Sequence, residues 1–301
     1  AKHYTPPDPR PFDGHPRAVA VSPPSGRGPA YHPVTGIFGL IAKATAETDP
    51  EFSQTLQWLW MRGGQSMGYI SDRMGGLEIL ATDGALPARI PDWTSEQFPL
   101  MDVLLRHGVG NPLEYYANLV MDPKGYTAYY SENGGFAAIW AKGVPTTVRF
   151  AGHGYGEREE IFISRVLLAR QPGNVADRKQ RFMYAGPMAV TAFSALPRQD
   201  YAVADMRLER PITKWHGPKQ QEPTLNLPRW STVTQEGQPP LDWRRQVLFL
   251  KGDESSEPAY FLLRDTVSSN QPTMWQFWTL SDKIGTPDEA KNLQNFLADK
   301  P

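Results

Sequence analysis

Residues 126–150, YTAYYSENGGFAAIWAKGVPTTVRF, place a strand pattern directly beside a group of polar and aromatic residues. The run FAAIWA, which begins at Phe136, is an apolar strand-forming sequence, and the KGVP that follows it is a turn signal. The preceding YYSENGG brings together two tyrosines, a serine, a glutamate and an asparagine. The stretch therefore predicts a strand of a sheet and a candidate chemical site next to it.

Short strands separated by turn signals continue from about residue 100 toward the end of the chain. Candidate strands include MDVLLRHGV, LEYYANLVM, MAVTAFSAL, DYAVADMRLER, RRQVLFLK and PAYFLLRD, and the turns include DPKG, ENGG and KGDESSEP. Strands this dense, with no helical pattern between them, indicate an antiparallel sandwich of large sheets. We therefore expect a mainly β fold, with a large antiparallel β-sandwich over residues 96–301.

A helical hairpin is predicted ahead of the sandwich, in residues 35–64. Asp49 is a suitable N-cap, Pro50 fits the first helical position, and Gly63 can end the second helix. The side chains expected on the buried faces are Ile37, Phe38 and Ile41 in the first helix, and Phe52, Leu56, Leu59 and Trp60 in the second. A hairpin this apolar needs a partner, either the rest of the chain or further helices.

The first 34 residues carry nine prolines. Because proline lacks the amide donor, this segment can hold neither a helix nor a central strand. We expect a proline-rich arm laid across the surface. The expected domain division is therefore residues 1–95, the arm and helical hairpin, and residues 96–301, the sandwich.

Composition excludes several classes of function. The formal net charge is −1, from 31 basic and 32 acidic residues, so the chain as a whole has no electrostatic preference for nucleic acid. No apolar run reaches the roughly 18 residues of a membrane span. The absence of cysteine excludes disulfides, thiolate metal sites and cysteine nucleophiles, and it is compatible with a secreted or periplasmic protein. The 29 prolines, 26 glycines and nine tryptophans suit a β-rich protein that handles sugars.

Several segments, taken in order, resemble one family. They are DPEFSQTLQWLWMRGG, NPLEYYANLVMDPKGYTAYYSENGGFAAIWAKGVPTTVRFAGHGY, QDYAVADMRLERP, RRQVLFLKGDESSEPAYFLLRDTV and TMWQFWTL. This order resembles the C-terminal part of heparinase II/III-like polysaccharide lyases over about residues 35–280. In that family a toroid of paired helices precedes a large antiparallel β-sandwich. The resemblance implies that the hairpin is the end of such a toroid.

The sequence departs from the family where the resemblance would place a metal. In the family, the stretch that matches YYSENGGF carries histidines and an aspartate, whereas this chain has Tyr130 and Glu132 at those places. The further ligand positions fall at Arg149 and near Ile163 or Ser164. We therefore expect no metal and no cofactor. Arg149 would take over the electrostatic role of the cation, because a guanidinium suits a substrate carboxylate.

Lyases of this class remove the C5 proton of a uronate and expel the O4 leaving group. They need a base, an acid and a group that neutralises the carboxylate. Tyrosine can serve as base or acid when a nearby cation lowers its pKa, and Tyr129 or Tyr130 with Arg149 would give that pairing. Asn133 is suited to hold the carboxylate. The same stretch also suits a plain hairpin, in which SENGG is the turn and the tyrosines pack across the strands.

A second candidate is the segment RFAGHGYGEREE, residues 149–160. Its glycines leave His153 and Tyr155 exposed, and histidine is the natural proton carrier near neutral pH. An ordinary glycine-rich connection is the alternative. In TKWHGPK, Trp215 is a candidate for stacking on a sugar, although the sequence also suits an exposed turn.

Other tryptophans are expected in the core. They are Trp58 and Trp60 in the hairpin, and Trp275 and Trp278 in a late strand.

The resemblance implies a polysaccharide lyase that acts on an anionic, uronate-containing polysaccharide by β-elimination. Tyr130, His153 and Tyr155 would be catalytic, and Tyr129, Asn133, Arg149 and Trp215 would bind substrate. An upstream helical toroid or another subunit would be its partner. The alternative is a non-catalytic carbohydrate-binding or structural sandwich, or a subunit of a larger assembly. The missing metal ligands favour the alternative, and the His153 segment favours activity.

Overall fold

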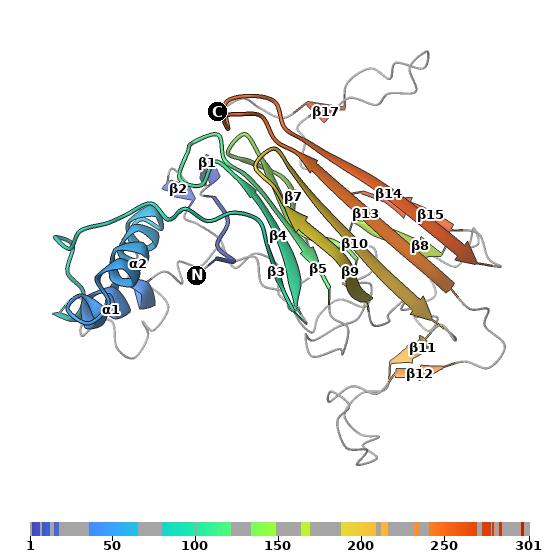
Figure 1. Cartoon of the computed structure of the whole chain (residues 1–301), viewed down its shortest axis with the longest axis horizontal. Helices are drawn as coiled ribbons and strands as arrows, with labels where there is room; N and C mark the ends of the chain where they lie inside the picture. Colours follow the sequence, from blue (N-terminus) through green and yellow to red (C-terminus); the bar gives the residue numbers. More distant parts are fainter. Residues whose placement is uncertain are drawn as a thin grey trace.

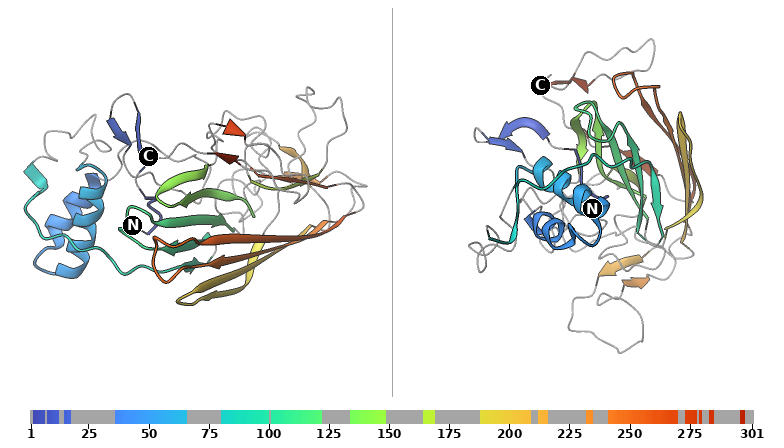
Figure 2. Two further views of the ribbon diagram at one scale, coloured as in Figure 1. Left: turned by 90° about the horizontal axis from the view of Figure 1, so that it is seen from above. Right: turned by 60° about the vertical axis from the view of Figure 1, so that its left-hand side comes forward.

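The computed structural model is mainly β, with a helical hairpin at one end of two large antiparallel sheets (Figure 1). Figure 2 shows the two sheets as stacked layers. This confirms the fold class predicted from the sequence. The structure describes residues 2–6, 8–12, 15–17, 36–65, 80–99, 101–121, 134–148, 164–168, 188–208, 212–215, 232–234, 241–269, 273–277, 279, 283–284 and 296–297.

The helices of the described residues are α1 (Gly36–Thr45) and α2 (Pro50–Arg62). The five-stranded sheet has the order β3-β4-β5-β6-β7, with β3 (Glu96–Phe98), β4 (Asp102–His107), β5 (Tyr115–Val120), β6 (Phe136–Ala141) and β7 (Val144–Val148). The four-stranded sheet has the order β14-β13-β10-β9, with β14 (Tyr260–Ser269), β13 (Leu241–Leu250), β10 (Gln199–Leu208) and β9 (Met188–Ala195).

Two-stranded pairs accompany the large sheets. They are β1 (Asp8–Phe12) with β2 (His15–Arg17), β8 (Arg165–Leu168) with β15 (Thr273–Gln276), β11 (Ile212–Trp215) with β12 (Thr232–Thr234), and β16 (Lys283–Ile284) with β17 (Phe296–Leu297). The proline-rich arm thus contains a small separate ribbon. The arm prolines that the structure describes, Pro6, Pro9, Pro11 and Pro16, lie outside the large sheets, where the missing amide donor costs no ladder hydrogen bond.

The hairpin begins and ends where the sequence predicts. The Asp49 carboxylate accepts a hydrogen bond from the Phe52 amide at 3.1 Å, and Gly63 caps the C-terminus. The helices approach closely at Gly39, where a Cβ atom would lie 2.7 Å from the Trp60 ring. In the described residues, neither helix is long and apolar enough to cross a bilayer.

The buried face of the hairpin differs in part from the predicted one. Its core is formed by Phe38, Ala42, Leu56, Leu59 and Trp60 together with Tyr4, and Trp58 packs against it. Ile37 and Phe52 were predicted to be buried but are 40% and 44% exposed. The buried stripe of α1 is centred on Phe38 and Ala42, about 100° around the helix from Ile37.

The main core lies between the two large sheets. It includes Leu105 of β4, Leu119 of β5 and Phe136 of β6 on one side, and Val247 and Phe249 of β13 on the other. The opposite face of the five-stranded sheet is also buried, and its side chains Leu104, Tyr116, Ala138 and Trp140 form a second cluster. The outer face of the four-stranded sheet is more open, and every second residue of β14 is exposed. The five-stranded sheet is therefore the inner layer of the molecule.

A glycine is required at the turn between β6 and β7. Gly143 has a φ of 76°, and a Cβ atom there would lie 1.8 Å from the Pro112 carbonyl oxygen. The Gly143 amide donates a hydrogen bond of 3.0 Å to the carbonyl of Glu114. The KGVP turn predicted from the sequence thus joins the strands while lying directly on the neighbouring loop.

Candidate functional site

The residues predicted to form the site lie almost wholly outside the described residues. Those outside are Tyr129, Tyr130, Glu132, Asn133, Arg149, His153 and Tyr155, together with the YTAYY strand candidate. For Trp215 the structure describes the backbone, which ends β11 and pairs with Thr232 of β12. The roles assigned to these residues from the sequence therefore stay predictions.

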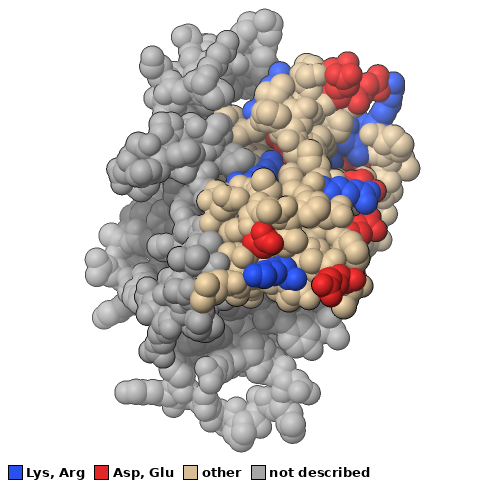
Figure 3. Space-filling model, turned by 90° about the vertical axis from the view of Figure 1, so that its left-hand side faces the viewer, with Lys and Arg blue, Asp and Glu red and all other residues tan. Residues whose placement is uncertain are grey.

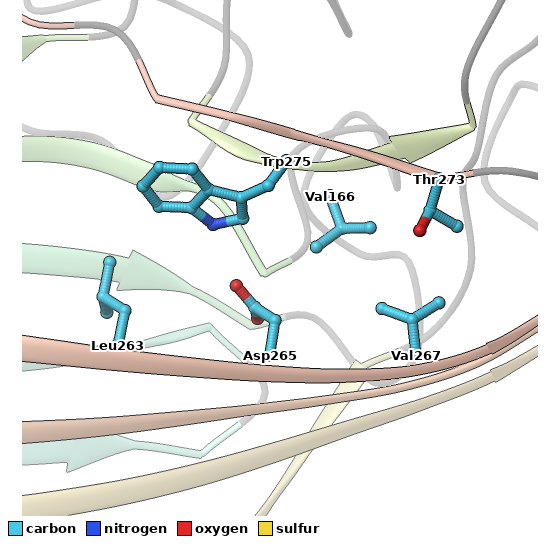
Figure 4. A pocket seen from close by; sticks show the side chains of 6 residues that line it. All are labelled: Val166, Leu263, Asp265, Val267, Thr273 and Trp275. Carbon is cyan, nitrogen blue, oxygen red and sulfur yellow. The ribbon is translucent and has the colours of Figure 1, made fainter. Parts of the chain in front are cut away.

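The described residues form a cavity of about 410 Å³ between β14 and the β8–β15 pair. Figure 4 shows its two sides. Leu263, Asp265 and Val267 project from β14, and the facing residues come from β8 and β15. These are Val166, Thr273 and Trp275. The cavity lies at the end of the sandwich opposite α1 and α2 (Figure 1).

Trp275 lies on the wall of this cavity and is 53% exposed. The sequence predicts it in the core, and this prediction is wrong. Its strand β15 pairs with β8 instead of joining the four-stranded sheet, so the indole faces the cavity. The ring stacks on Phe277 at 5.5 Å between centroids and an interplanar angle of 10°, which fixes its orientation. Trp278 lies outside the described residues.

Asp265 is held rigidly on the opposite side of the cavity. Its Oδ1 accepts hydrogen bonds from Trp243 Nε1 and Arg245 Nε, both at 2.8 Å, and its Oδ2 accepts one from Arg245 Nη2 at 2.8 Å. Asp265 and Arg245 are directly opposite each other on β14 and β13. Arg245 is 1% exposed and Asp265 is 11% exposed. The carboxylate is thus a hydrogen-bond acceptor in a fixed position, and the positive charge of Arg245 balances its negative charge.

The remaining nitrogen of Arg245 joins the two large sheets. Nη1 donates to the carbonyl of Gly134 and, at 3.2 Å, to that of Ser164. The guanidinium also lies 5.0 Å from the centre of the Trp243 ring. Every nitrogen of this buried side chain therefore has an acceptor, as burial of a charge requires.

Ser164 marks the corner where the resemblance would place a metal. It is buried and forms an isolated bridge with Phe136. Arg245 is the cation that the structure describes at this corner. Among the described residues there is no group of three or more histidine, aspartate or glutamate side chains suited to a metal ion. That Arg149 replaces a metal remains a prediction.

A histidine–carboxylate pair lies where the N-terminal segment crosses the five-stranded sheet. His3 Nε2 is 3.0 Å from Asp102 Oδ2, and Asn118 Nδ2 donates to the same oxygen at 2.8 Å. Asp102 is fully buried, and the His3 ring packs against Phe98 with 4.7 Å between centroids and an interplanar angle of 50°. A carboxylate in this position orients the imidazole. The pair fastens residues 2–6 to the sheet.

A buried ion network lies beside this pair. Arg106 Nη1 donates to Glu114 Oε1 at 2.7 Å, and Arg62 at the end of α2 donates to Glu114 Oε2 at 2.8 Å. Arg106 Nη2 donates to the carbonyls of Lys2 and Tyr4. Burial lowers the pKa of Arg106, and the negative charge of Glu114 opposes that shift. The network ties the hairpin, the N-terminal segment and the sheet together.

The neighbouring Tyr4 has no acid–base role near neutral pH. Burial raises its pKa to about 12, and its ring packs edge-on against Phe38 at 4.8 Å. Its contribution is to pack the N-terminal segment against the hairpin.

Sequence reasoning missed Asp265 and Arg245, although a signal was present. In RRQVLFL, Arg245 falls in the same phase as Val247 and Phe249, which face the core. Asp265 likewise falls in phase with Leu263 and Val267. A charged residue in the inward phase of a strand indicates a buried ion pair or a cavity, because an unpaired buried charge is costly.

The end of the molecule that carries α1 and α2 has acidic and basic side chains interspersed (Figure 3). Several are paired, as in Arg89 with Glu51 at 2.8 Å and Lys2 with Glu96. In the part of this face that the structure describes, basic residues do not gather into one strip. An anionic polymer would find no continuous track of positive charge there.

The arrangement of a helical hairpin followed by a large β-sandwich is similar in fold to solved structures of heparinases. Among solved structures it resembles a heparinase III, with a TM-score of 0.50 and 15% sequence identity over 88% of this chain and 32% of that chain. A second heparinase III structure, with methylated lysines, gives 0.50 and 13% over 91% and 32%. For a heparan sulfate lyase from Pedobacter heparinus the values are 0.42 and 14% over 81% and 29%.

This chain spans about a third of the length of the heparinase III structures it resembles. At this identity the likeness concerns the fold. No protein-family model and no curated protein sequence matches the chain.

Proposed function

We propose that this chain is the β-sandwich part of a polysaccharide lyase that cleaves an anionic, uronate-bearing glycan by β-elimination. The observation that carries the proposal is the likeness of fold to a heparinase III over 88% of the chain. The order of the segments in the sequence, which resembles the same family, also supports it. The likeness itself concerns the fold, so the chemistry must be tested directly.

In the proposed reaction, a base takes the C5 proton of the uronate, and the electron pair forms the C4–C5 double bond. The C4–O4 bond breaks, and the leaving oxygen receives a proton from an acid. Tyr130, His153 and Tyr155 would share the base and acid roles. Arg149 and Asn133 would neutralise the carboxylate as charge develops on it, and no metal or cofactor is invoked.

Tyr129 and Trp215 would bind the neighbouring sugar rings. Both rings offer a flat apolar surface together with a polar group.

The proposed partners are the glycan and a set of helices that precede the hairpin or belong to another subunit. Residues 1–95 would then be the end of a helical toroid. Exposed apolar side chains on and beside the hairpin support this, since Phe52, Met61 and Ile90 are 44%, 45% and 53% exposed. A secreted or periplasmic location, where such glycans are met, is part of the proposal.

The second candidate is a non-catalytic carbohydrate-binding sandwich. The cavity beside Trp275 favours it, because the part of its lining that the structure describes has an exposed aromatic ring and contains no histidine, lysine or tyrosine that could transfer a proton. Under this alternative the fold of a lyase serves binding alone.

The test is ultraviolet absorbance of the unsaturated product, with this chain incubated with heparin, chondroitin, alginate and ulvan. We expect absorbance to rise with at least one glycan, and to fall to background in Tyr130→Phe and His153→Ala. Tyr260→Phe is the matched control, because Tyr260 is 57% exposed on the outer face of β14. No absorbance change with any glycan, despite measurable binding, would overturn the lyase proposal in favour of the binding sandwich.

A further inference from the structure

The cavity between β14 and the β8–β15 pair combines the exposed aromatic ring of Trp275 with the Asp265 carboxylate, which three hydrogen bonds hold in place. Figure 4 shows the Trp275 indole nitrogen and the Asp265 carboxylate pointing into the same space, with Thr273 farther along the cavity, beyond Val166. Val166, Leu263 and Val267 supply the apolar walls and complete the lining. A donor, an acceptor and a hydroxyl around apolar walls suit a ligand that is itself half polar.

The charges of the described lining disfavour an anionic ligand group in the cavity. Asp265 is the charged residue of the described lining, and it is negative. The guanidinium of Arg245 cannot turn toward a ligand, because its Nε and Nη2 bind Asp265 and its Nη1 binds the carbonyls of Gly134 and Ser164. A carboxylate or sulfate in the cavity would meet the Asp265 carboxylate, and no side chain of the described lining offers it a free positive charge.

Asp265 retains capacity to accept a hydrogen bond from a ligand. Its Oδ1 already accepts from Trp243 and Arg245, whereas its Oδ2 accepts only from Arg245 among the described residues. A carboxylate has about four lone-pair sites in all, so Oδ2 can accept from a hydroxyl. Because the carboxylate is already fixed by three hydrogen bonds, binding a ligand requires little further ordering of the site.

We propose that this cavity binds a neutral pyranose ring. The Trp275 indole would cover the C–H face of the ring, and Asp265 Oδ2 and the Thr273 hydroxyl would bind its hydroxyl groups. The volume of about 410 Å³ lies within the roughly 300–1,000 Å³ of small-molecule sites. Only the source of the sugar rests on the proposed function. In a glycan that alternates uronate with a neutral sugar, the cavity would bind the neutral sugar.

Binding is measured by isothermal titration calorimetry on the whole chain, with three probes: cellotriose, the N-acetylglucosamine trimer and trigalacturonate. We expect at least one of the two neutral trisaccharides to bind and trigalacturonate to bind far more weakly. Trp275→Ala should weaken neutral binding about tenfold, the size expected for losing one aromatic stacking contact. Trp275→Phe, which keeps a ring, should retain most of the affinity.

Tyr260→Ala is the matched control, since it removes an aromatic ring about as exposed as Trp275. Tyr260 lies on β14, on the face of that strand opposite the cavity. This substitution should leave the affinity unchanged. Thermal melts of each variant establish that the sandwich is intact. We expect intact melts, because Trp275 is exposed and its replacement leaves no gap in the core.

The inference is overturned if neither neutral trisaccharide binds, if Trp275→Ala binds as wild type does, or if trigalacturonate binds equally well through Trp275. These outcomes are separable from those of the lyase test. Elimination activity without neutral-sugar binding would remove this inference alone. Binding that depends on Trp275, without elimination activity, would overturn the lyase proposal and still support the cavity as a site for a neutral sugar.

Discussion

Two buried arginines in different parts of the sandwich form the same kind of ion pair with different neighbours. Arg106 of β4 pairs with Glu114 and also donates to main-chain carbonyls of the N-terminal segment. Arg245 of β13 pairs with Asp265 and also donates to the carbonyls of Gly134 and Ser164. Both arginines are at most 3% exposed. The two sites, each called a joint below, therefore have the same chemistry: a buried arginine that binds one carboxylate and two main-chain carbonyls.

They differ in what covers the carboxylate. Glu114 is fully buried, and its oxygens are occupied by Arg106, by Arg62 and, at 3.2 Å, by the Gly110 amide. Asp265 is 11% exposed and borders a cavity. The first pair is a closed structural joint, whereas the second leaves an oxygen facing space that a ligand can fill. The position of the carboxylate thus separates a structural ion pair from a candidate binding group.

The largest effect is expected for Glu114→Gln. The change keeps the shape of the side chain but leaves two arginines, 2% and 12% exposed, without their shared negative partner. Breaking a buried pair in this way costs about 3–5 kcal/mol of the free energy of unfolding. Urea denaturation followed by circular dichroism measures it. A loss no larger than that of Asp265→Asn would break the comparison.

A smaller loss is expected for Asp265→Asn. Arg245 keeps the two main-chain carbonyls, and the amide oxygen can still accept from Trp243 or Arg245. We expect a loss of about 1.5–3 kcal/mol, the range for hydrogen bonds to charged groups. The same denaturation assay measures it. Stability equal to wild type would show that the pair is not a structural joint at all.

The smallest effect is expected for the surface pair Asp205–Arg244, which spans β10 and β13 at 2.7 Å. The hydrogen bond from Arg244 lowers the pKa of Asp205, and Thr191 also donates to this carboxylate. Asp205→Asn should cost at most about 1 kcal/mol at neutral pH, as for other exposed pairs.

The sign of the pH dependence follows from the lowered pKa of Asp205. The stabilisation is fully present above the ordinary carboxyl value of 3.8 and is lost as the pH falls through the lower value of the folded protein. The stability difference between wild type and Asp205→Asn should therefore disappear in acid. A difference that persists unchanged at low pH would contradict the assignment to this ion pair.

Much of the fold was predictable because each long strand carries its own pattern. FAAIWA forms β6, Phe136–Ala141, and DPEFSQTLQWLWMRGG forms α2 with the predicted Asp49 and Gly63 caps. The exposure of Ile37 was not predictable, because several apolar residues of α1 compete for one buried face. Nor does the pattern of a single strand show that the five-stranded sheet is covered on both faces.

The cavity was less predictable, because it depends on pairing between distant segments. The inward phase of Arg245 signals a buried partner, yet Asp265 is identified only once the register between β13 and β14 is known. Trp275 was predicted in the core, whereas its place is decided by the pairing of β15 with β8, more than 100 residues away in the chain. The active-site candidates in residues 126–160 stay predictions.

The hydrogen bonds from these arginines to main-chain carbonyls affect which substitutions the sequence can accept. Every residue type presents the same carbonyl, so Arg106 recognises the course of the chain at Lys2 and Tyr4 and not the identity of those residues. As far as this contact is concerned, such positions are free to drift over evolutionary time, and only the arginine must persist. Joints of this kind leave few marks for a sequence comparison to find. They suit a chain whose architecture resembles a heparinase III at 15% identity.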